Sequence, residues 1–423
     1  MSGESEDTQT GSPSRPPARR RVSRTTARWI DRSFVIMVMI VPTAGVVLAL
    51  VYAWRGALLS TANLVVFLVL WVTTLFAIEG GYHRYFSHRA FGTSRAFEAL
   101  LAIFGSLAFQ GPVIWWAATH RRHHRHADRP GDPHSPQLRG SGPRATLLGL
   151  WDAHMGWLFR EVDSISRKSH WQEYVPDLLE NRTIWLIHRH YMWWLALGLL
   201  LPTVLGGLLD GTLHGAFMGF LWGGLVRIFL VNHAIWAVNS ICHVYGRRPF
   251  ALQARDRSAN NALVALLSLG AGWHHNHHVF PGYSTTQLEP WQIDGTGLLL
   301  RLLGAMRVVR DLRLPSADRR GRQRRLRVAI ADQTARQWAN VSSLSGKRAF
   351  LETTSRHDVG ASLQLIGFEV SEPDAQHETS MEQFEPAEAV VEYVSLHGLG
   401  VRFVAPTPAL SEALDRLGAL ARR

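Results

Sequence analysis

Four apolar segments limit the fold of this chain more than any other feature. They cover residues 34–54, 61–79, 191–209 and 212–236, and carry no charge apart from Glu79 and Arg227. A helix needs about 20 such residues to cross a bilayer. Arg55 and Gly56 join the first pair, and Asp210 and Gly211 join the second. The segments therefore predict two transmembrane hairpins in an all-α integral membrane domain.

The distribution of basic residues predicts the orientation. Lys and Arg are scarce in the two hairpin tips and frequent in the N-terminal segment, 120–190 and 246–257. Because cytoplasmic loops carry the excess of Lys and Arg, both termini and the polar segments are expected on the cytoplasmic side of the cell (inner) membrane. The net charge of +12 is concentrated in 19–32 and 301–327, which favours flanks of membrane helices over nucleic-acid binding. Residues 1–33, rich in Ser, Pro and Arg, are expected to form a disordered tail.

Histidines are the second constraint, because nine of the 21 fall into spaced groups. A histidine with partners at i+3 and i+4 places three imidazoles on one helical face, where they can chelate a metal. This spacing occurs twice, and Asn239 stands four residues before one further histidine. His83 and His88, five residues apart, predict a helix end between them. The grouped residues are His83, His88, His120, His123, His124, His243, His274, His277 and His278.

Residues 99–118 are apolar enough to be a possible fifth span. If they crossed the membrane, the histidines before and after them would lie on opposite sides and could not meet. We expect this segment to be re-entrant or to lie in the interface. Nine imidazoles are too many for one ion, so two metals are predicted. A nitrogen-rich site without thiolates suits zinc, copper or iron. A site at the bilayer boundary favours a long apolar substrate, whose oxidation redox-inert zinc cannot perform; iron is favoured, and copper is second.

Four motifs carry a resemblance to a known family: GYHRYFSHRAF, THRRHHRHADRPGDPHSP, NSICHVYG and GWHHNHHVFP. They resemble the histidine boxes of membrane fatty-acid desaturases, in particular the stearoyl-CoA (Δ9) desaturase-like branch, over residues 30–312. The resemblance implies four transmembrane helices under a cytoplasmic helical cap. It also implies two Fe²⁺ ions held by the nine histidines above, with Asn239 reaching one iron through water. The implied activity is O₂-dependent introduction of a cis double bond at Δ9 of a fatty-acyl chain, carried by CoA or linked to lipid.

The resemblance also suggests substrate contacts and an electron supply. Trp157 and Arg227 match family positions and are candidate acyl-tunnel residues. Ala271, His275 and Gly111 depart from the family pattern, and the last leaves acyl-CoA open as the carrier. The single cysteine excludes an iron–sulfur cluster built within this chain, so an external ferredoxin or reductase is the expected donor. Hydrogen bonds to the ligands are expected from His126, His134 and His154.

Residues 316–423 differ in character from the membrane domain. Strand-like runs at 349–354, 361–370, 389–396 and 400–405, followed by an amphipathic stretch at 408–420, predict a small β-barrel with a closing helix. This part resembles a PilZ domain, which implies cyclic-di-GMP as a ligand. Gly346 falls one residue too late for the second motif of that family. The residues matching the two nucleotide motifs are Arg320, Arg324, Asn340 and Ser342.

Two other functions fit parts of the sequence. A membrane hydroxylase acting on alkanes or lipids uses similar histidine boxes, although NSICH and GDPHSP favour a desaturase. The chain would alternatively be a membrane-tethered cyclic-di-GMP receptor whose desaturase-like part is inert, against which the intact histidine set argues.

Overall fold

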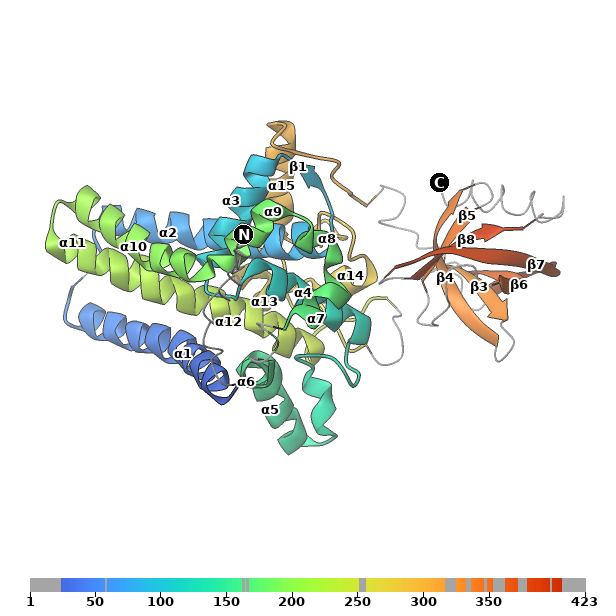
Figure 1. The fold of residues 1–423 in the computed structure, drawn as a ribbon, viewed down its shortest axis with the longest axis horizontal. Helices are drawn as coiled ribbons and strands as arrows, with labels where there is room; N and C mark the ends of the chain where they lie inside the picture. Colours follow the sequence, from blue (N-terminus) through green and yellow to red (C-terminus); the bar gives the residue numbers. More distant parts are fainter. Residues whose placement is uncertain are drawn as a thin grey trace, which may run out of the picture.

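The computed structural model shows a mostly helical protein with a separate set of strands at the C-terminal end of the sequence (Figure 1). The residues that the structure describes are 24–57, 59–161, 164, 167–250, 256–315, 325–331, 336–345, 348–352, 362–371, 379–395 and 398–404.

Four helices in the described residues are long and apolar enough to cross a membrane: Val35–Trp54, Thr61–Ser87, Tyr191–Asp210 and Leu213–His243. They run alongside one another in Figure 1. The first lies in α1 (Arg24–Trp54) and the third is α10 (Tyr191–Asp210). Because α1 already begins at Arg24, residues 24–33 are helical, and the prediction that they belong to a disordered tail is wrong. The second and fourth spans are longer than predicted.

Two of the spans contain π-helix. The second is α2 (Thr61–Phe76) followed by the π-helix η1 (Ala77–Ser87). The fourth is α11 (Leu213–Met218), the π-helix η5 (Gly219–Val226) and α12 (Arg227–Ser240). Such segments are rare and frequently lie at functional sites. The helix end predicted between His83 and His88 is confirmed, since η1 ends at Ser87.

Small residues allow the second hairpin to pack closely. Gly211 ends α10 with a φ of 71°, which suits a residue without a side chain. A Cβ on Gly219 would lie 2.2 Å from the carbonyl oxygen of Pro202 on α10, and one on Gly206 would lie 2.6 Å from the carbonyl oxygen of Gly215. Small residues at such crossings let helix backbones approach in a membrane. This packing fixes the fourth span, which ends at His243.

Short helices between and after the spans form the predicted helical cap. The segment expected not to cross the membrane is broken into α3 (Arg95–Ser106) and α4 (Val113–His126), neither long enough to span. Between them, Phe109 and Gly111 have φ values of 63° and 99°. The other α-helices of the cap are α5 (Pro143–Trp151), α6 (Trp157–Glu161), α7 (Lys168–Tyr174), α8 (Pro176–Leu179), α9 (Arg182–Arg189), α13 (Ala262–Leu267), α14 (His274–Val279) and α15 (Gly295–Ala305).

The main apolar core joins the second span to the cap. Leu75, Ile78 and Tyr82 pack with Ile114 of α4 and Ile184 of α9. β1 (Gly92–Thr93), just after the second span, pairs with β2 (Val309–Arg310), just after α15. This two-stranded sheet joins the first and last segments of the cap. The segments that carry the histidines are therefore held in place by this apolar core and by the strand pairing.

The C-terminal strands are antiparallel, in the hydrogen-bonded order β3-β4-β5-β8-β7-β6, with β6 paired again to β3. The strand runs predicted near 349, 361, 389 and 400 correspond to β5 to β8, whereas β3 and β4 were missed. The helix predicted at 408–420 lies outside the described residues. The strands are β3 (Arg325–Ala331), β4 (Arg336–Ser345), β5 (Arg348–Glu352), β6 (Ser362–Ser371), β7 (Thr379–Ser395) and β8 (Gly398–Phe403).

Candidate metal centre

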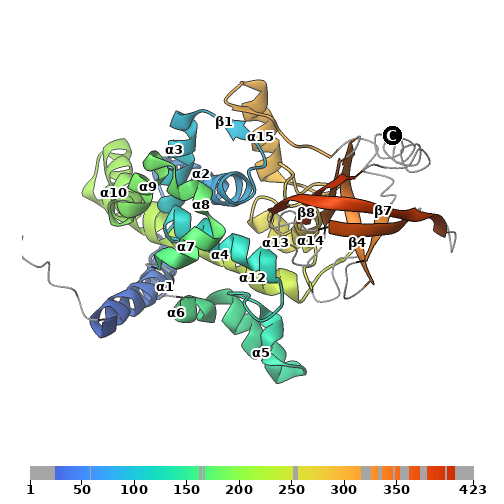
Figure 2. The same ribbon diagram turned by 45° about the vertical axis from the view of Figure 1, so that its right-hand side comes forward.

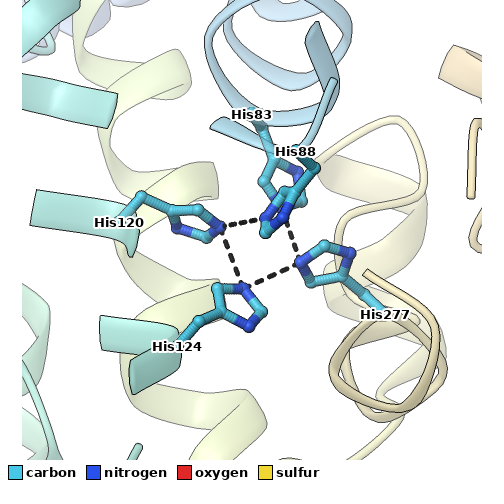
Figure 3. Close-up of side chains that lie close together, drawn as sticks. All are labelled: His83, His88, His120, His124 and His277. Atoms are coloured by element: carbon cyan, nitrogen blue, oxygen red, sulfur yellow. Dashed lines mark hydrogen bonds between the residues drawn. The ribbon is translucent and has the colours of Figure 1, made fainter. Parts of the chain in front are cut away.

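Five of the nine grouped histidines meet in one cluster, with their Nε2 atoms turned toward one another (Figure 3). His277 Nε2 lies 2.8 Å from His83 Nε2 and 3.0 Å from His124 Nε2. His120 Nε2 lies 2.9 Å from His88 Nε2 and 3.0 Å from His124 Nε2. The ligand atoms of all five lie within 4.8 Å of one another. Residues far apart in the sequence, from η1 and the position after it, from α4 and from α14, thus form a single site, the five-histidine cluster.

The other four form a second, adjacent group, the four-histidine cluster. His274 Nε2 lies 3.0 Å from the Nε2 atoms of both His243 and His278, and His123 Nε2 lies 3.3 Å from that of His278. All four residues are buried. Helix α4 serves both clusters, since its His120 and His124 belong to the first and its His123 to the second, and α14 is shared in the same way. Figures 1 and 2 both place these two helices close together.

In four of these imidazoles, Nδ1, the nitrogen that faces away from the cluster, is hydrogen-bonded to a carboxylate. In the four-histidine cluster, Nδ1 of His123 lies 3.0 Å from Asp132, Nδ1 of His243 lies 2.9 Å from Asp128, and Nδ1 of His278 lies 2.8 Å from Asp256. In the five-histidine cluster, Nδ1 of His83 lies 2.8 Å from Glu79. A carboxylate oxygen accepts, so Nδ1 carries the proton in each pair and the Nε2 lone pair of the neutral ring points into the cluster.

This arrangement suits a cation in each cluster. Nε2 lone pairs that point toward one another at these distances repel, and a metal ion bound between them would remove that repulsion. Imidazole nitrogens that bind one metal ion at about 2.1 Å lie about 3 Å apart or slightly more. The observed Nε2 separations of 2.8 to 3.3 Å match that value. The residues fit a pair of metal ions bound by nitrogen, in buried surroundings.

Burial disfavours the charged form of five of the imidazoles, and metal ligands must be neutral. Burial and the neighbouring rings hold the pKa of His120, His124, His274 and His277 well below the usual value for histidine. Burial lowers the pKa of His278 to about 4, although Asp256 opposes the shift. At neutral pH these rings are therefore uncharged and ready to bind.

A buried arginine braces the first cluster. Glu79 holds His83 with one oxygen and accepts from Arg84 Nη2 with the other, at 3.0 Å. Arg84 also makes two parallel hydrogen bonds of 2.9 Å to Asp294, which caps the N-terminus of α15. All three side chains are almost fully buried. The guanidinium group therefore ties the helix that carries His83 to the segment after the last histidine group.

The other predicted site residues fall in different places. Asn239 is half-buried on α12, four residues before His243, and its water-mediated role stays a prediction. Trp157 is buried and stacks on Trp115, with ring centroids 5.9 Å apart. Arg227 is buried and donates to Thr74 Oγ1 and to the carbonyl oxygens of Gly223, Leu107 and Gly198.

The histidines expected to hydrogen-bond the ligands do not all do so. His134 is buried beside His123, with ring centroids 4.4 Å apart, and its Nδ1 lies 3.9 Å from Asp132. His154 instead lies 2.9 Å from His233 Nδ1 and 3.0 Å from Ser240 Oγ, away from the grouped histidines, so that expectation is wrong for it. His126 is only partly buried.

The structure describes little of the four residues that match the nucleotide motifs. Arg320 and Arg324 lie outside the described residues, and Asn340 and Ser342 are described only as backbone of β4. Asn340 pairs with Arg327 and Glu352, and Ser342 is the extra residue where the pairing with β5 shifts register.

Sequence reasoning missed the carboxylates that orient the ligands. A signal existed for three of them. Glu79 stands four residues before His83, one helical turn away, and Asp128 and Asp132 lie inside the motif HADRPGDPH. No sequence signal identified Asp256, because only the tertiary fold brings it close to His278.

Loss of one such carboxylate should weaken metal binding without unfolding the chain. We expect Asp256→Asn to lower metal affinity at the four-histidine cluster about 10- to 100-fold, since the amide no longer fixes the His278 tautomer. Metal content after a timed chelator challenge measures this. Asp152→Asn is the control, because Asp152 pairs with Arg139 and Arg160 instead. Equal metal loss in both variants would contradict the assigned role.

The four apolar spans and the two clusters are those of an integral membrane protein with a histidine-rich site that fits metal. Comparison with known proteins names its family. Residues 60–293 match the family described as fatty acid desaturase. The chain belongs to this family and is an oxidoreductase of it, and its buried clusters fit the metal site typical of membrane desaturases.

Relatives within the family differ in what their names describe. The chain is 39% identical over 307 residues to hex-5-enoyl-[acyl-carrier protein] acetylenase of Moorena producens (strain JHB), covering 71% of this chain and 93% of the relative. It is 34% identical over 251 residues to the sn-1 stearoyl-lipid 9-desaturase of Anabaena variabilis, covering 59% and 83%. It is 37% identical over 257 residues to the chloroplastic palmitoyl-monogalactosyldiacylglycerol delta-7 desaturase of Arabidopsis thaliana, covering 59% and 62%.

Proposed function

We propose that this chain uses O₂ to introduce a cis double bond at Δ9 of a fatty-acyl chain, at a centre of two Fe²⁺ ions. The observation that carries the proposal is the convergence of nine Nε2 atoms into two adjacent buried clusters, in a chain of the desaturase family. His83, His88, His120, His124 and His277 would hold one iron. His123, His243, His274 and His278 would hold the other, with Asn239 acting through water.

Four carboxylates of the chain orient the histidine rings that would bind the iron. When bound, the iron pair would supply the oxidising power that removes two hydrogens from neighbouring methylenes. The balance is –CH₂–CH₂– + O₂ + 2e⁻ + 2H⁺ → –CH=CH– + 2H₂O. Asp128, Asp132, Asp256 and Glu79 keep the protons on Nδ1, so every held ring offers Nε2 inward. Burial of the clusters limits access of bulk water.

Two residues are proposed to guide the acyl chain. Trp157 lies between Trp115 and His134, whose ring centroid is 5.2 Å away. His134 in turn lies beside His123, so one ring separates this indole from the four-histidine cluster. Arg227 ties the π-helical part of the fourth span to the neighbouring spans through uncharged oxygens, and we place it beside the acyl tunnel. Relatives named for acyl-carrier-protein, lipid-linked and CoA substrates support a fatty-acyl chain, with CoA or lipid as the proposed carrier.

Product analysis tests the proposal. A bacterial host lacking its own desaturase and expressing the chain should gain Δ9 cis-monounsaturated acyl groups, located by derivatising the double bond before mass spectrometry. His277→Ala should give none at equal expression. Hydroxylated chains in place of alkenes would instead assign a hydroxylase, and an unchanged profile with metal bound would favour the inert receptor.

A second candidate rests on one relative. The chain is similar to an acetylenase over 93% of that relative's length, which supports further oxidation of an existing double bond to a triple bond. Supplying the same host with a monounsaturated acid separates the two candidates. An alkyne product would assign the acetylenase, whereas a saturated acid converted to an alkene assigns the desaturase.

Electrons are proposed to come from a separate ferredoxin or reductase. Cys242 is the chain's single cysteine, and it is buried on the cap side of α12. Iron–sulfur clusters are held by several cysteine thiolates, so the two electrons of each turnover must enter from a partner.

The region 316–423 is proposed to be a PilZ-like β-barrel that is dispensable for the chemistry. All nine histidines and all four spans precede Pro315. A chain truncated after Pro315 should therefore still insert, bind metal and make product in cells, which the same fatty-acid profile measures. A truncated protein that inserts but holds neither metal nor product would contradict this.

Cyclic-di-GMP is the proposed ligand of this region. Arg320 and Arg324 would bind its phosphates or guanines as arginine forks do, with Asn340 and Ser342 nearby in the motif. Calorimetry of the full chain with cyclic-di-GMP tests the assignment against an Arg320→Ala, Arg324→Ala variant. Equal heats for both would remove the nucleotide assignment.

A further inference from the structure

One face of the cap exposes large apolar side chains next to the four-histidine cluster. Leu263, Leu266 and Leu267 are exposed on α13, and Trp291 and Ile293 are exposed on the loop before α15. The two segments are neighbours. Gly272 packs on the backbone of Val264 and Ala265, and the next residue, Trp273, donates from Nε1 to the Ile293 carbonyl at 2.8 Å. We call these five residues the α13 face. Contiguous exposed apolar patches of this kind mark interaction sites.

The α13 face is joined to the metal centre by two aromatic rings. Trp291, 58% exposed, meets the buried Trp273 edge to face with ring centroids 5.2 Å apart. Trp273 is followed in the chain by His274, a member of the four-histidine cluster. Electron transfer slows steeply with the gap between donor and acceptor. A carrier seated over Trp291 would be separated from the cluster by these two indoles and one peptide link.

The rim of the α13 face is basic. Arg247, Arg248 and Arg257 are exposed where the chain approaches α13, with Arg247 bridged to Asn260 just before that helix. Glu289, two residues before Trp291, is an exposed carboxylate in the same segment. An apolar centre with a basic rim complements an acidic protein that has its own apolar contact patch. Electron-transfer encounters use small interfaces, and charge complementarity sets their association rate.

We propose that the α13 face docks the electron donor, an acidic iron–sulfur protein, and that electrons enter the four-histidine site through Trp291 and Trp273. Each encounter would pass one electron from the donor's reduced iron–sulfur cluster to the metal pair that the histidines would hold, so two encounters would supply each turnover. This inference rests on the proposed function, since it names the partner of that same centre.

The test separates electron delivery from chemistry. The oxidised full-length protein in vesicles is mixed with a reduced plant-type [2Fe–2S] ferredoxin, and reoxidation of the ferredoxin is followed by absorbance. Trp291→Leu and Leu263→Asp should each slow it at least about 10-fold, the charged variant by weakening the encounter. Product formed by protein reduced with dithionite should stay unchanged. The wild-type rate should also fall as salt rises, because charge steering is screened.

Matched controls lie on α5, where Trp151 is 55% exposed and Leu147 is 69% exposed, against 67% for Leu263. Trp151→Leu and Leu147→Asp should leave ferredoxin oxidation unchanged. Equal slowing in the controls, or no slowing in Trp291→Leu and Leu263→Asp, would overturn the docking site. Slowing of the Leu263→Asp protein in vesicles but not in detergent would overturn it in favour of a lipid contact. Absence of any product from dithionite-reduced wild type would instead refute the proposed function.

Discussion

Replacing His124 or His277 with alanine should abolish desaturation and remove metal, while the chain still inserts into the membrane. Each imidazole contributes its Nε2 to the five-histidine cluster, and His277 lies within 3.0 Å of two other members. Insertion depends on the four apolar spans, which neither change touches. Metal analysis and fatty-acid profiling at equal membrane expression measure both effects.

His275→Ala is the matched control, because His275 lies in α14 with His277 but its ring points away from the two histidine clusters. Its Nδ1 lies 2.9 Å from the Ser258 carbonyl oxygen, and its Nε2 lies 2.9 Å from that of Phe250. The variant should lose about 1–3 kcal/mol of stability from unsatisfied backbone groups but keep its metal. An inactive, metal-free His275→Ala beside an active His274→Ala would refute the assignment of the last histidine group.

Arg84→Leu should lower the free energy of unfolding by about 3–5 kcal/mol, because Glu79 and Asp294 would be left buried without a counter-charge. Glu79 would also lose the partner that orients it toward His83, so the five-histidine cluster should bind metal more weakly. Thermal unfolding in detergent, with metal content measured in parallel, follows both effects.

Arg89→Leu provides the comparison for this ion pair. Its side chain is 65% exposed, and it pairs with Asp177, which also pairs with Arg121. An exposed pair of this kind is worth about 0–1 kcal/mol. If the Arg84 and Arg89 variants unfold at the same temperature and hold the same metal, the bracing role of Arg84 is wrong.

The histidine groups were predictable because metal ligands on one helix must follow the helical repeat. His120, His123 and His124 have that spacing, and the structure divides them between the two clusters. The requirement that distant groups meet also excluded a crossing by residues 99–118, and the break between α3 and α4 agrees. Apolar length similarly identified all four spans, because a bilayer imposes it.

Long-range partners and local backbone form were not predictable in the same way. The approach of Asp256 to His278 depends on tertiary folding, and no local repeat encodes it. The π-helix η5 is as apolar as an ordinary span, and η1 carries charged and histidine residues, so hydropathy reports neither backbone form. Strand β3 was missed because its sequence RLRVAIA follows a run of arginines that reads as a charged linker.

Metal analysis of protein isolated from its native host tests the central claim most directly. We expect about two irons per chain, one for each histidine cluster, with ⁵⁷Fe Mössbauer spectra showing nitrogen-ligated iron and no iron–sulfur signal. Zinc found only after overexpression does not bear on the claim, because zinc outcompetes ferrous iron at such sites. A single metal per chain, or two zincs from the native host, would contradict a di-iron centre.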